Sequence, residues 1–178
     1  LRALLTEMLD TFAPLAREKG LSIRLGPGDA TVETDPGLLR SIVQNFLSNA
    51  IRYTDTGGII VGVRRRGSDA RIDVIDSGAG IPATKRQVIF REFERLSNAQ
   101  EGGIGLGLAI VERTARLLDA RITMRSTEGR GSRFSVALPV AAIAIDPIAA
   151  RPMLTGPMPA TMRLLIVDDD PANCEALS

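Results

Sequence analysis

The sequence predicts an α+β fold, because two kinds of apolar pattern occur in turn between residues 1 and 140. Apolar residues recur at helical spacing in residues 1–17, 36–51 and 106–118, which indicates amphipathic helices. Apolar and polar residues alternate in residues 21–25, which is typical of a half-buried strand, and residues 59–63, 71–75, 121–125 and 132–138 predict further strands. Helices and strands of this kind bury their apolar faces against each other, so we expect one shared core.

Composition excludes several classes of function. The 178 residues carry 22 basic and 21 acidic side chains, so a net charge of +1 gives no reason to expect nucleic acid or an anionic membrane as partner. Aromatic residues make up 3% of the chain and tryptophan is absent, which argues against a base-stacking platform. The absence of histidine excludes histidine-based catalysis and histidine zinc ligands within this chain. A single cysteine, Cys174, no signal peptide and no membrane-length apolar run predict a cytoplasmic location.

The first helical pattern is followed by short strand patterns. Pro14 lies inside the helix, and we expect it to kink or shorten the helix, because proline cannot donate the i→i−4 hydrogen bond. Gly20 marks the end of the helix. Residues 21–25 and 31–34 then predict two short strands around a turn at residues 26–29.

The second helix has a clear start signal and an unusual polar line. Asp35 is a favourable N-cap, and Pro36 is a favourable first helical residue. Asn45, Asn49 and Arg52 stand at i, i+4 and i+7, so they share one line along the helix. Asparagine is a poor helix former, because its amide competes for backbone hydrogen bonds. These amides either bridge neighbouring backbone groups or contact a ligand.

A carboxylate with neighbouring glycines follows the next pair of strands. Residues 59–63 and 71–75 predict an antiparallel hairpin, with residues 64–69 as its solvated turn. Asp76, Gly78 and Gly80 come next, in the sequence DSGAG. A carboxylate beside closely approaching backbone suits the exocyclic amine of adenine, which donates hydrogen bonds. A plain glycine-rich turn is the alternative.

The third helix begins inside the glycine-rich residues 102–107. Each glycine disfavours a helix by about 1 kcal/mol relative to alanine, but glycines let free N–H groups and the positive end of the helix dipole approach a phosphate. The stretch has neither the Gly-Lys-Ser/Thr of a P-loop nor the spacing of a dinucleotide-binding loop. Residues 84–96 predict helix, and residues 97–103 predict a mobile loop placed where a lid would be. A flexible hinge before a surface helix is the alternative.

The composition changes beyond residue 140. Residues 141–161 are rich in alanine and proline and predict a linker. Residues 162–167 predict a buried strand that ends at Asp168 and Asp169, a position where an α/β domain would hold a hard cation. Asp170, directly before Pro171, could instead cap a helix. The expected organisation is a domain at 1–140, a linker at 141–161 and the start of a second domain at 162–178.

Residues 1–139 resemble the catalytic, ATP-binding domain of bacterial sensor histidine kinases, in the superfamily shared with gyrase, the mismatch-repair ATPase and the ninety-kilodalton heat-shock chaperone. Residues 44–54 resemble its N box, 76–80 its first glycine box, 89–93 its F box, 103–108 its second glycine box and 128–134 its closing strand-turn motif. The resemblance implies a two-layer α/β sandwich (the Bergerat fold), with a mixed sheet of about five strands and three helices on one face.

The resemblance also implies ATP and Mg²⁺ as cofactors and a role for each motif residue. Asn49 would coordinate Mg²⁺, with Asn45 beside it, and Arg52 would neutralise phosphate charge. Tyr53 would pack near the adenine or ribose, and Asp76 would accept the adenine amine. The other implied nucleotide-binding residues are Gly78, Gly80, Gly103, Gly105, Leu106 and Gly107.

Two features bear on the implied reaction. The ATPases of the superfamily carry a glutamate base where Asn45 stands, and an amide cannot take a proton from water at neutral pH. The resemblance therefore implies weak hydrolysis and transfer to a protein histidine. Arg91-Glu92 reverses the usual order of the F box, and Arg95 in the lid is implied to reach the γ-phosphate. The implied catalytic residues are thus Asn45, Arg52 and Arg95.

Residues 162–178 resemble the start of a response-regulator receiver domain, in which Asp168 and Asp169 would bind Mg²⁺. We therefore expect part of a hybrid histidine kinase, whose partners are its own receiver domain and the dimerisation helices that bear the acceptor histidine; by itself the fragment is expected to be a monomer. Two alternatives are a serine kinase of the anti-sigma-factor type and a nucleotide-binding regulatory module without transfer activity. The receiver-like tail argues against the first, and the intact motifs argue against the second.

Overall fold

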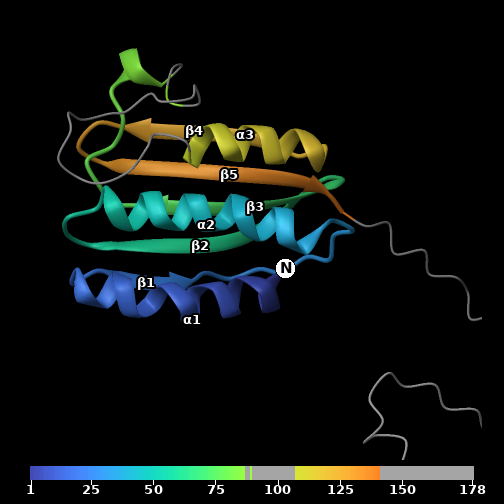
Figure 1. Cartoon of the computed structure of the whole chain (residues 1–178), viewed down its shortest axis with the longest axis horizontal. Helices are drawn as coiled ribbons and strands as arrows, with labels where there is room; N and C mark the ends of the chain where they lie inside the picture. The colour runs from blue at the N-terminus through green and yellow to red at the C-terminus, as the bar shows by residue number, and fades with distance from the viewer. Residues whose placement is uncertain (87–88, 90–106, 141–178) are drawn as a thin grey trace, which may run out of the picture. The chain divides into compact units, whose positions relative to one another are not determined.

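Helices and strands form where the periodicity of the apolar residues changes, and together they build two layers. The computed structural model describes residues 1–86, 89 and 107–140. Helices α1 (Arg2–Glu18), α2 (Pro36–Arg52) and α3 (Gly107–Leu117) lie over one face of a five-stranded sheet (Figure 1). This architecture confirms the predicted α+β fold, with a mixed sheet and three helices on one face. None of the helices in this described part is both long and apolar enough to cross a membrane.

The sheet brings distant parts of the chain together at one end. Its strands are β1 (Ser22–Leu25), β2 (Gly58–Arg66), β3 (Asp69–Asp76), β4 (Arg121–Thr127) and β5 (Gly131–Pro139), in the order β1-β2-β3-β5-β4. Strand β1 is parallel to β2, because α2 carries the chain back between them, and the other neighbours are antiparallel. The pairing of Ile75 with Arg133 therefore places the end of β3 beside the beginning of β5.

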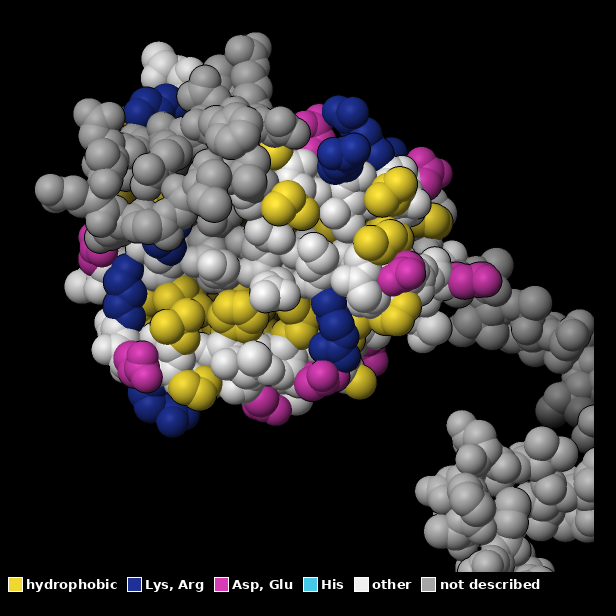
Figure 2. Space-filling model, viewed as in Figure 1, with side chains coloured by type: hydrophobic (Ala, Val, Ile, Leu, Met, Phe, Trp, Pro, Cys, Tyr) yellow, Lys and Arg dark blue, Asp and Glu magenta, His cyan; other side chains and the backbone are white. Residues whose placement is uncertain are grey.

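Helix α2 lies at the centre of the helix layer. The carboxylate of Asp35 accepts a hydrogen bond from the N–H of Leu38 at 2.9 Å, so the predicted N-cap begins this helix. The ring of Phe46, which is fully buried, lies 5.4 Å from the ring of Phe134 on β5. This contact ties the helix layer to the sheet. On the helix side of the molecule, apolar side chains are visible between α1 and α2, bordered by charged side chains (Figure 2).

Pro14 does not end α1, which continues to Glu18. Of the two expected effects of Pro14, a kink or a shortening, the shortening is therefore wrong. Leu9 before the proline and Ala16 after it are both buried, so packing against the core holds the two halves of the helix although one backbone hydrogen bond is missing.

The hairpin of β2 and β3 is longer than predicted. Residues 64–66 belong to β2 and not to a solvated turn, and Gly67 and Ser68 alone connect the two strands. Gly67 has a φ of +58°, the conformation that a two-residue hairpin turn requires. Such a turn keeps the strands paired up to its edges, so the arginines extend the sheet.

Two smaller expectations also change. Residues 31–34 are not a strand: they contribute one isolated bridge, from Val32 to Val140. A 3-10 turn at Ala83–Lys85 occupies the beginning of the helix predicted at 84–96, most of which lies outside the described residues. The linker predicted at 141–161 and the second domain predicted at 162–178 lie outside them entirely.

Candidate functional site

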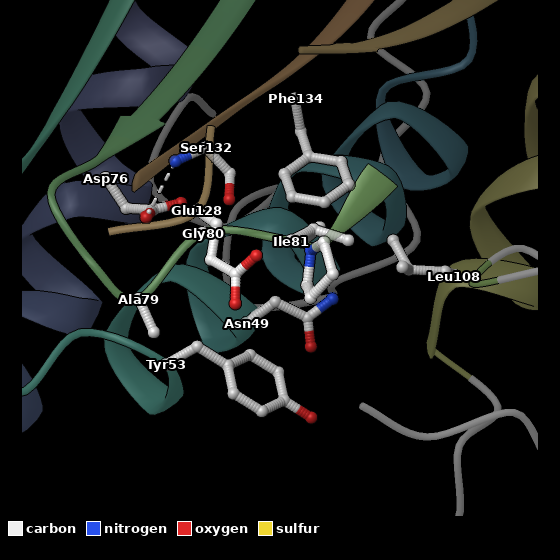
Figure 3. Close-up of a pocket in the computed structure, with 11 residues that line it drawn as sticks. Asn49, Tyr53, Asp76, Ala79, Gly80, Ile81, Leu108, Glu128, Ser132 and Phe134 are labelled. Atoms are coloured by element: carbon white, nitrogen blue, oxygen red, sulfur yellow. Dashed lines mark hydrogen bonds between the residues drawn. The ribbon is translucent and has the colours of Figure 1, made fainter. Parts of the chain in front are cut away.

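A cavity of about 290 Å³ opens between the helix layer and the end of the sheet (Figure 3). Its walls come from the second half of α2, the turn after β3, the beginning of α3 and the β4–β5 hairpin. The lining residues are Asn49, Tyr53, Asp76, Ala79, Gly80, Ile81, Pro82, Leu108, Glu128, Ser132 and Phe134. A mostly apolar hollow with a few polar groups is typical of a small-molecule site.

Asp76, the last residue of β3, supplies a fixed carboxylate to this cavity. It is 8% exposed, and its Oδ1 accepts a hydrogen bond from the N–H group of Gly78 at 2.9 Å. A second one comes from the N–H group of Ser132 at 3.0 Å (Figure 3). Burial raises the pKa of the Asp76 carboxyl above its usual range, and these backbone hydrogen bonds partly oppose that rise. The result is a rigid acceptor whose ionised form gains from a ligand that donates a hydrogen bond to it.

Two glycines allow the turn after Asp76 to pass close to its neighbours. A Cβ on Gly78 would stand 2.1 Å from the carbonyl oxygen of Tyr53, and one on Gly80 would stand 2.1 Å from that of Thr127. Gly80 also has a φ of +71°, which side chains rarely allow. The turn is therefore wedged between the end of α2 and the end of β4, and this position forms one wall of the cavity.

The polar residues that share one line along α2 have different roles: one bridges the helix backbone and another lines the cavity. Asn45 donates a hydrogen bond from Nδ2 to the carbonyl of Ser41 at 2.8 Å, as expected for an amide that bridges backbone. Asn49, one turn further along, lines the cavity (Figure 3). The guanidinium carbon of Arg52 lies 5.8 Å from the centre of the Tyr53 ring. The structure thus brings Asn49 and Tyr53 together with Asp76 in one cavity, with Arg52 next to them.

The beginning of α3 closes the same end of the molecule. Gly107 is the first described residue of α3, and a Cβ there would stand 2.8 Å from Oδ1 of Asn45. The backbone at the predicted second glycine box therefore approaches the predicted N box at this point. The other residues predicted in that glycine box and lid, Arg95, Gly103, Gly105 and Leu106, lie outside the described residues, as do Asp168 and Asp169.

Sequence reasoning missed several residues of the cavity. Glu128, Ser132 and Phe134 come from the β4–β5 hairpin, where the sequence showed a closing strand-turn motif but no contact with Asp76. The antiparallel pairing of β3 with β5 brings them there. Only a correct strand order, with β5 rather than β4 next to β3, would have predicted that these residues line the cavity. The apolar walls also include residues next to the motif glycines, which give no separate signal: Ala79, Ile81 and Leu108 directly follow a glycine, and Pro82 follows Ile81.

The fold and the cavity define the class of the protein: a two-layer α/β domain that holds a small-molecule site between its helices and its sheet. The chain belongs to the family of histidine kinase-, DNA gyrase B- and HSP90-like ATPases, whose family model matches residues 34–142.

Relatives narrow this assignment. The circadian input-output histidine kinase CikA of Synechococcus elongatus is 34% identical over 189 aligned residues, which cover 100% of this chain and 25% of CikA. The sensor histidine kinase RcsC of Escherichia coli is 35% identical over 145 residues, which cover 78% of this chain and 15% of RcsC. The chain thus spans a quarter or less of the length of these curated relatives.

Solved structures agree. The structure of full-length ShkA in complex with AMPPNP superposes with a TM-score of 0.70 at 31% identity, over 78% of this chain and 29% of ShkA. A nucleotide-free catalytic domain of the histidine kinase ThkA gives a TM-score of 0.67 at 25% identity, over 79% of this chain and 94% of that domain. The described part of the chain is an ATPase-family domain of the kind found in sensor histidine kinases.

Proposed function

We propose that the cavity binds ATP, with the adenine base at Asp76 and the phosphates towards α3. The observation that carries this proposal is the buried carboxylate of Asp76, held by two backbone N–H groups in the wall of a mostly apolar hollow. A base with an exocyclic amine satisfies this acceptor, and the apolar walls suit its ring faces. The complex of the related ShkA with AMPPNP supports an adenine nucleotide as the ligand.

The phosphates would lie near Asn49, Arg52 and Gly107. The described part of α3 starts at Gly107, and the N–H groups and positive dipole end at the start of a helix favour an anion; Arg52 adds a positive charge nearby. Gly103, Gly105 and Leu106 precede α3 directly in the sequence, and we propose that they extend this cradle, with Arg95 reaching the terminal phosphate.

The donor groups present fit a Mg²⁺ ion that is brought in with the nucleotide. The described residues contain no cluster of three or more acidic, histidine or cysteine side chains that could hold a metal by itself. Mg²⁺ prefers oxygen ligands and is usually held by phosphates and waters with one or two protein groups. The amide oxygen of Asn49, which lines the cavity, is the group that we propose as its protein ligand, and the ion would neutralise phosphate charge.

We further propose that the domain transfers the γ-phosphoryl group to a histidine of a longer protein, as in a sensor histidine kinase. The 178 residues contain no histidine, so the acceptor must come from another segment or chain. Asn45 supports transfer over hydrolysis, because its amide cannot remove a proton from water at neutral pH. Its Nδ2 is already engaged with the carbonyl of Ser41, so its place next to Gly107 is fixed by its own helix.

Calorimetric titration with AMPPNP, with and without Mg²⁺, tests the nucleotide site. We expect binding that Mg²⁺ strengthens, and we expect the Asp76→Asn variant to lose it. Asp10→Asn, an exposed carboxylate on α1, is the matched control and should bind like the wild type. Equal affinity in the Asp76 variant and the control would reject the assignment of the adenine site.

Transfer is tested separately, by adding γ-labelled ATP and a histidine-bearing dimerisation fragment from a related kinase. Label on the fragment that depends on its histidine supports the kinase function. Tight nucleotide binding without label on any supplied fragment would favour a regulatory module instead. The cytoplasmic location, the monomeric state, the linker at 141–161 and the receiver start at 162–178, with Asp168 and Asp169 as its Mg²⁺ pair, remain predictions from the sequence.

A further inference from the structure

The face of the sheet that points away from the helices carries an unusual concentration of arginine. Side chains alternate between the two faces of a strand, and the strand register assigns seven arginines and two aspartates to this open face. The arginines are Arg24, Arg64, Arg66, Arg71, Arg121, Arg125 and Arg133; the aspartates are Asp69 and Asp73. No lysine or glutamate stands at an open-face position of the five strands.

Part of this positive charge is balanced within the face. Arg64 and Arg71 stand directly opposite each other on β2 and β3. Asp73 lies between them, with its carboxylate oxygens 3.6 Å from Nε of Arg64 and 3.0 Å from Nε of Arg71. Ser135 donates a further hydrogen bond to Asp73 Oδ1 at 2.6 Å. Arg66 stands opposite Asp69 at the hairpin end. Each of these three arginines therefore has an acidic neighbour, and Arg64 and Arg71 share theirs.

The remaining four arginines of this face stand opposite no acidic residue in the five strands. Arg125 stands directly opposite Arg133, on β4 and β5, and like charges in this position destabilise a sheet. Within the described part of the chain, no carboxylate forms an ion pair with either of them, or with Arg24 and Arg121. The face thus keeps four guanidinium groups that a negatively charged partner would satisfy.

An apolar hollow lies among these charges. Ile60 and Ile75 stand opposite each other on β2 and β3, and the register continues this row to Arg24 on one side and to Arg133 and Arg125 on the other. A cavity of about 310 Å³ is lined by both isoleucines together with Gly26, Pro27, Gly28, Gly62, Val63, Arg64 and Asp73. Neighbouring strands lie about 4.8 Å apart, so the arginines flank the hollow within the reach of one peptide segment.

We propose that this face binds an acidic segment of a partner protein. An apolar side chain of that segment would enter the hollow beside Ile60 and Ile75, and flanking carboxylates would meet Arg133, Arg125 and Arg24. Arginine suits this task better than lysine, because its planar fork pairs with a carboxylate through two parallel hydrogen bonds. No aromatic side chain stands at an open-face position of the five strands, so the face lacks the stacking platforms of single-stranded nucleic acid binding. This surface lies on the opposite side of the sheet from the nucleotide cavity, so the proposal does not depend on that site.

Fluorescence anisotropy with a labelled peptide, in which glutamate pairs flank single leucines, tests the charge requirement. We expect binding by the whole chain that weakens with added salt, and a loss of about tenfold or more in Arg125→Glu/Arg133→Glu. Arg17→Glu/Arg113→Glu makes the same charge change at two exposed helix positions and should bind like the wild type. Equal affinity in the two double variants, or no binding by the wild type, would overturn the proposal.

The hollow has its own test. Gly62 lines the hollow, and a Cβ there would meet no atom within 4 Å, so we expect Gly62→Val to occupy part of the hollow. We expect this variant to keep its melting temperature and its affinity for AMPPNP while it loses affinity for the peptide. Unchanged peptide affinity would overturn the role of the hollow, and tighter binding of oligothymidylate than of the peptide would show a nucleic-acid surface instead.

Discussion

Replacing Asp76 with asparagine exchanges a carboxylate for an amide of nearly the same shape. The amide oxygen can still accept the hydrogen bonds from the N–H groups of Gly78 and Ser132, which now reach Oδ1. The local backbone should therefore keep its structure. The amide also places two donors where the carboxylate placed a second acceptor, so one of them faces the proposed adenine amine.

The expected loss of affinity follows from this change of partner. A hydrogen bond to a charged group contributes about 1.5–3 kcal/mol, and leaving a buried donor without a partner costs a further 1–3 kcal/mol or so. Each 1.4 kcal/mol or so is a tenfold change in Kd. We therefore expect AMPPNP binding in Asp76→Asn to weaken by about two to four orders of magnitude, which calorimetry would register as no detectable binding.

Without nucleotide, Asp76→Asn should be at least as stable as the wild type at pH 7, although its affinity for AMPPNP falls. This difference in sign separates loss of the ligand contact from loss of the fold. Burial raises the pKa of the Asp76 carboxyl, so this group stabilises the folded protein when protonated, and that contribution is lost as the pH rises through the raised pKa. In the absence of nucleotide, the free energy of unfolding of the wild type relative to Asp76→Asn should therefore increase as the pH falls from 7 towards 4. Urea denaturation at several pH values measures it. A difference that is constant with pH, or weak binding explained by an unfolded variant, would refute the reasoning.

Three further changes test other parts of the site. Asn49→Asp should weaken AMPPNP binding in Mg²⁺ by about tenfold, because the new charge stands next to the phosphates; a titration series in Mg²⁺ measures this, and unchanged affinity would reject Asn49 as the ligand. Gly80→Ala should destabilise the domain by more than 1 kcal/mol or so in urea, because its Cβ would overlap the carbonyl of Thr127, whereas Gly129→Ala, with a φ of +73° but open space, should cost less. Lys19→Met should cost about 1 kcal/mol, since Lys19 Nζ donates to the last carbonyls of α2 at 3.1 and 2.7 Å; a variant as stable as the wild type would show that this cap contributes nothing.

Local signals were sufficient where one segment determines its own structure. Asp35 and Pro36 predicted the beginning of α2 correctly, because capping depends on residues a few positions apart. The position of Asp76 at a strand end was predicted from the same kind of local pattern. Sequence reasoning misplaced the turn of the β2–β3 hairpin, because three consecutive arginines end the apolar run although they continue β2.

The part of the cavity that sequence reasoning missed depends on contacts between distant segments. Ser132 reaches Asp76 only because β5, and not β4, pairs with β3. No pattern within either strand specifies that order. Pro14 also shows that local preference alone is insufficient. Proline disfavours a helix, but burial of Leu9 and Ala16 on either side overrides this preference.

The cavity is lined by four segments that lie far apart in the sequence: the end of α2, the turn after β3, the start of α3 and the β4–β5 hairpin. A ligand that touches all four acts as a non-covalent cross-link, since none of these segments can unfold without releasing it. At a nucleotide concentration about 100 times Kd, mass action alone would add about 2.7 kcal/mol to the free energy of unfolding. The melting temperature of this domain should therefore report how much nucleotide it holds.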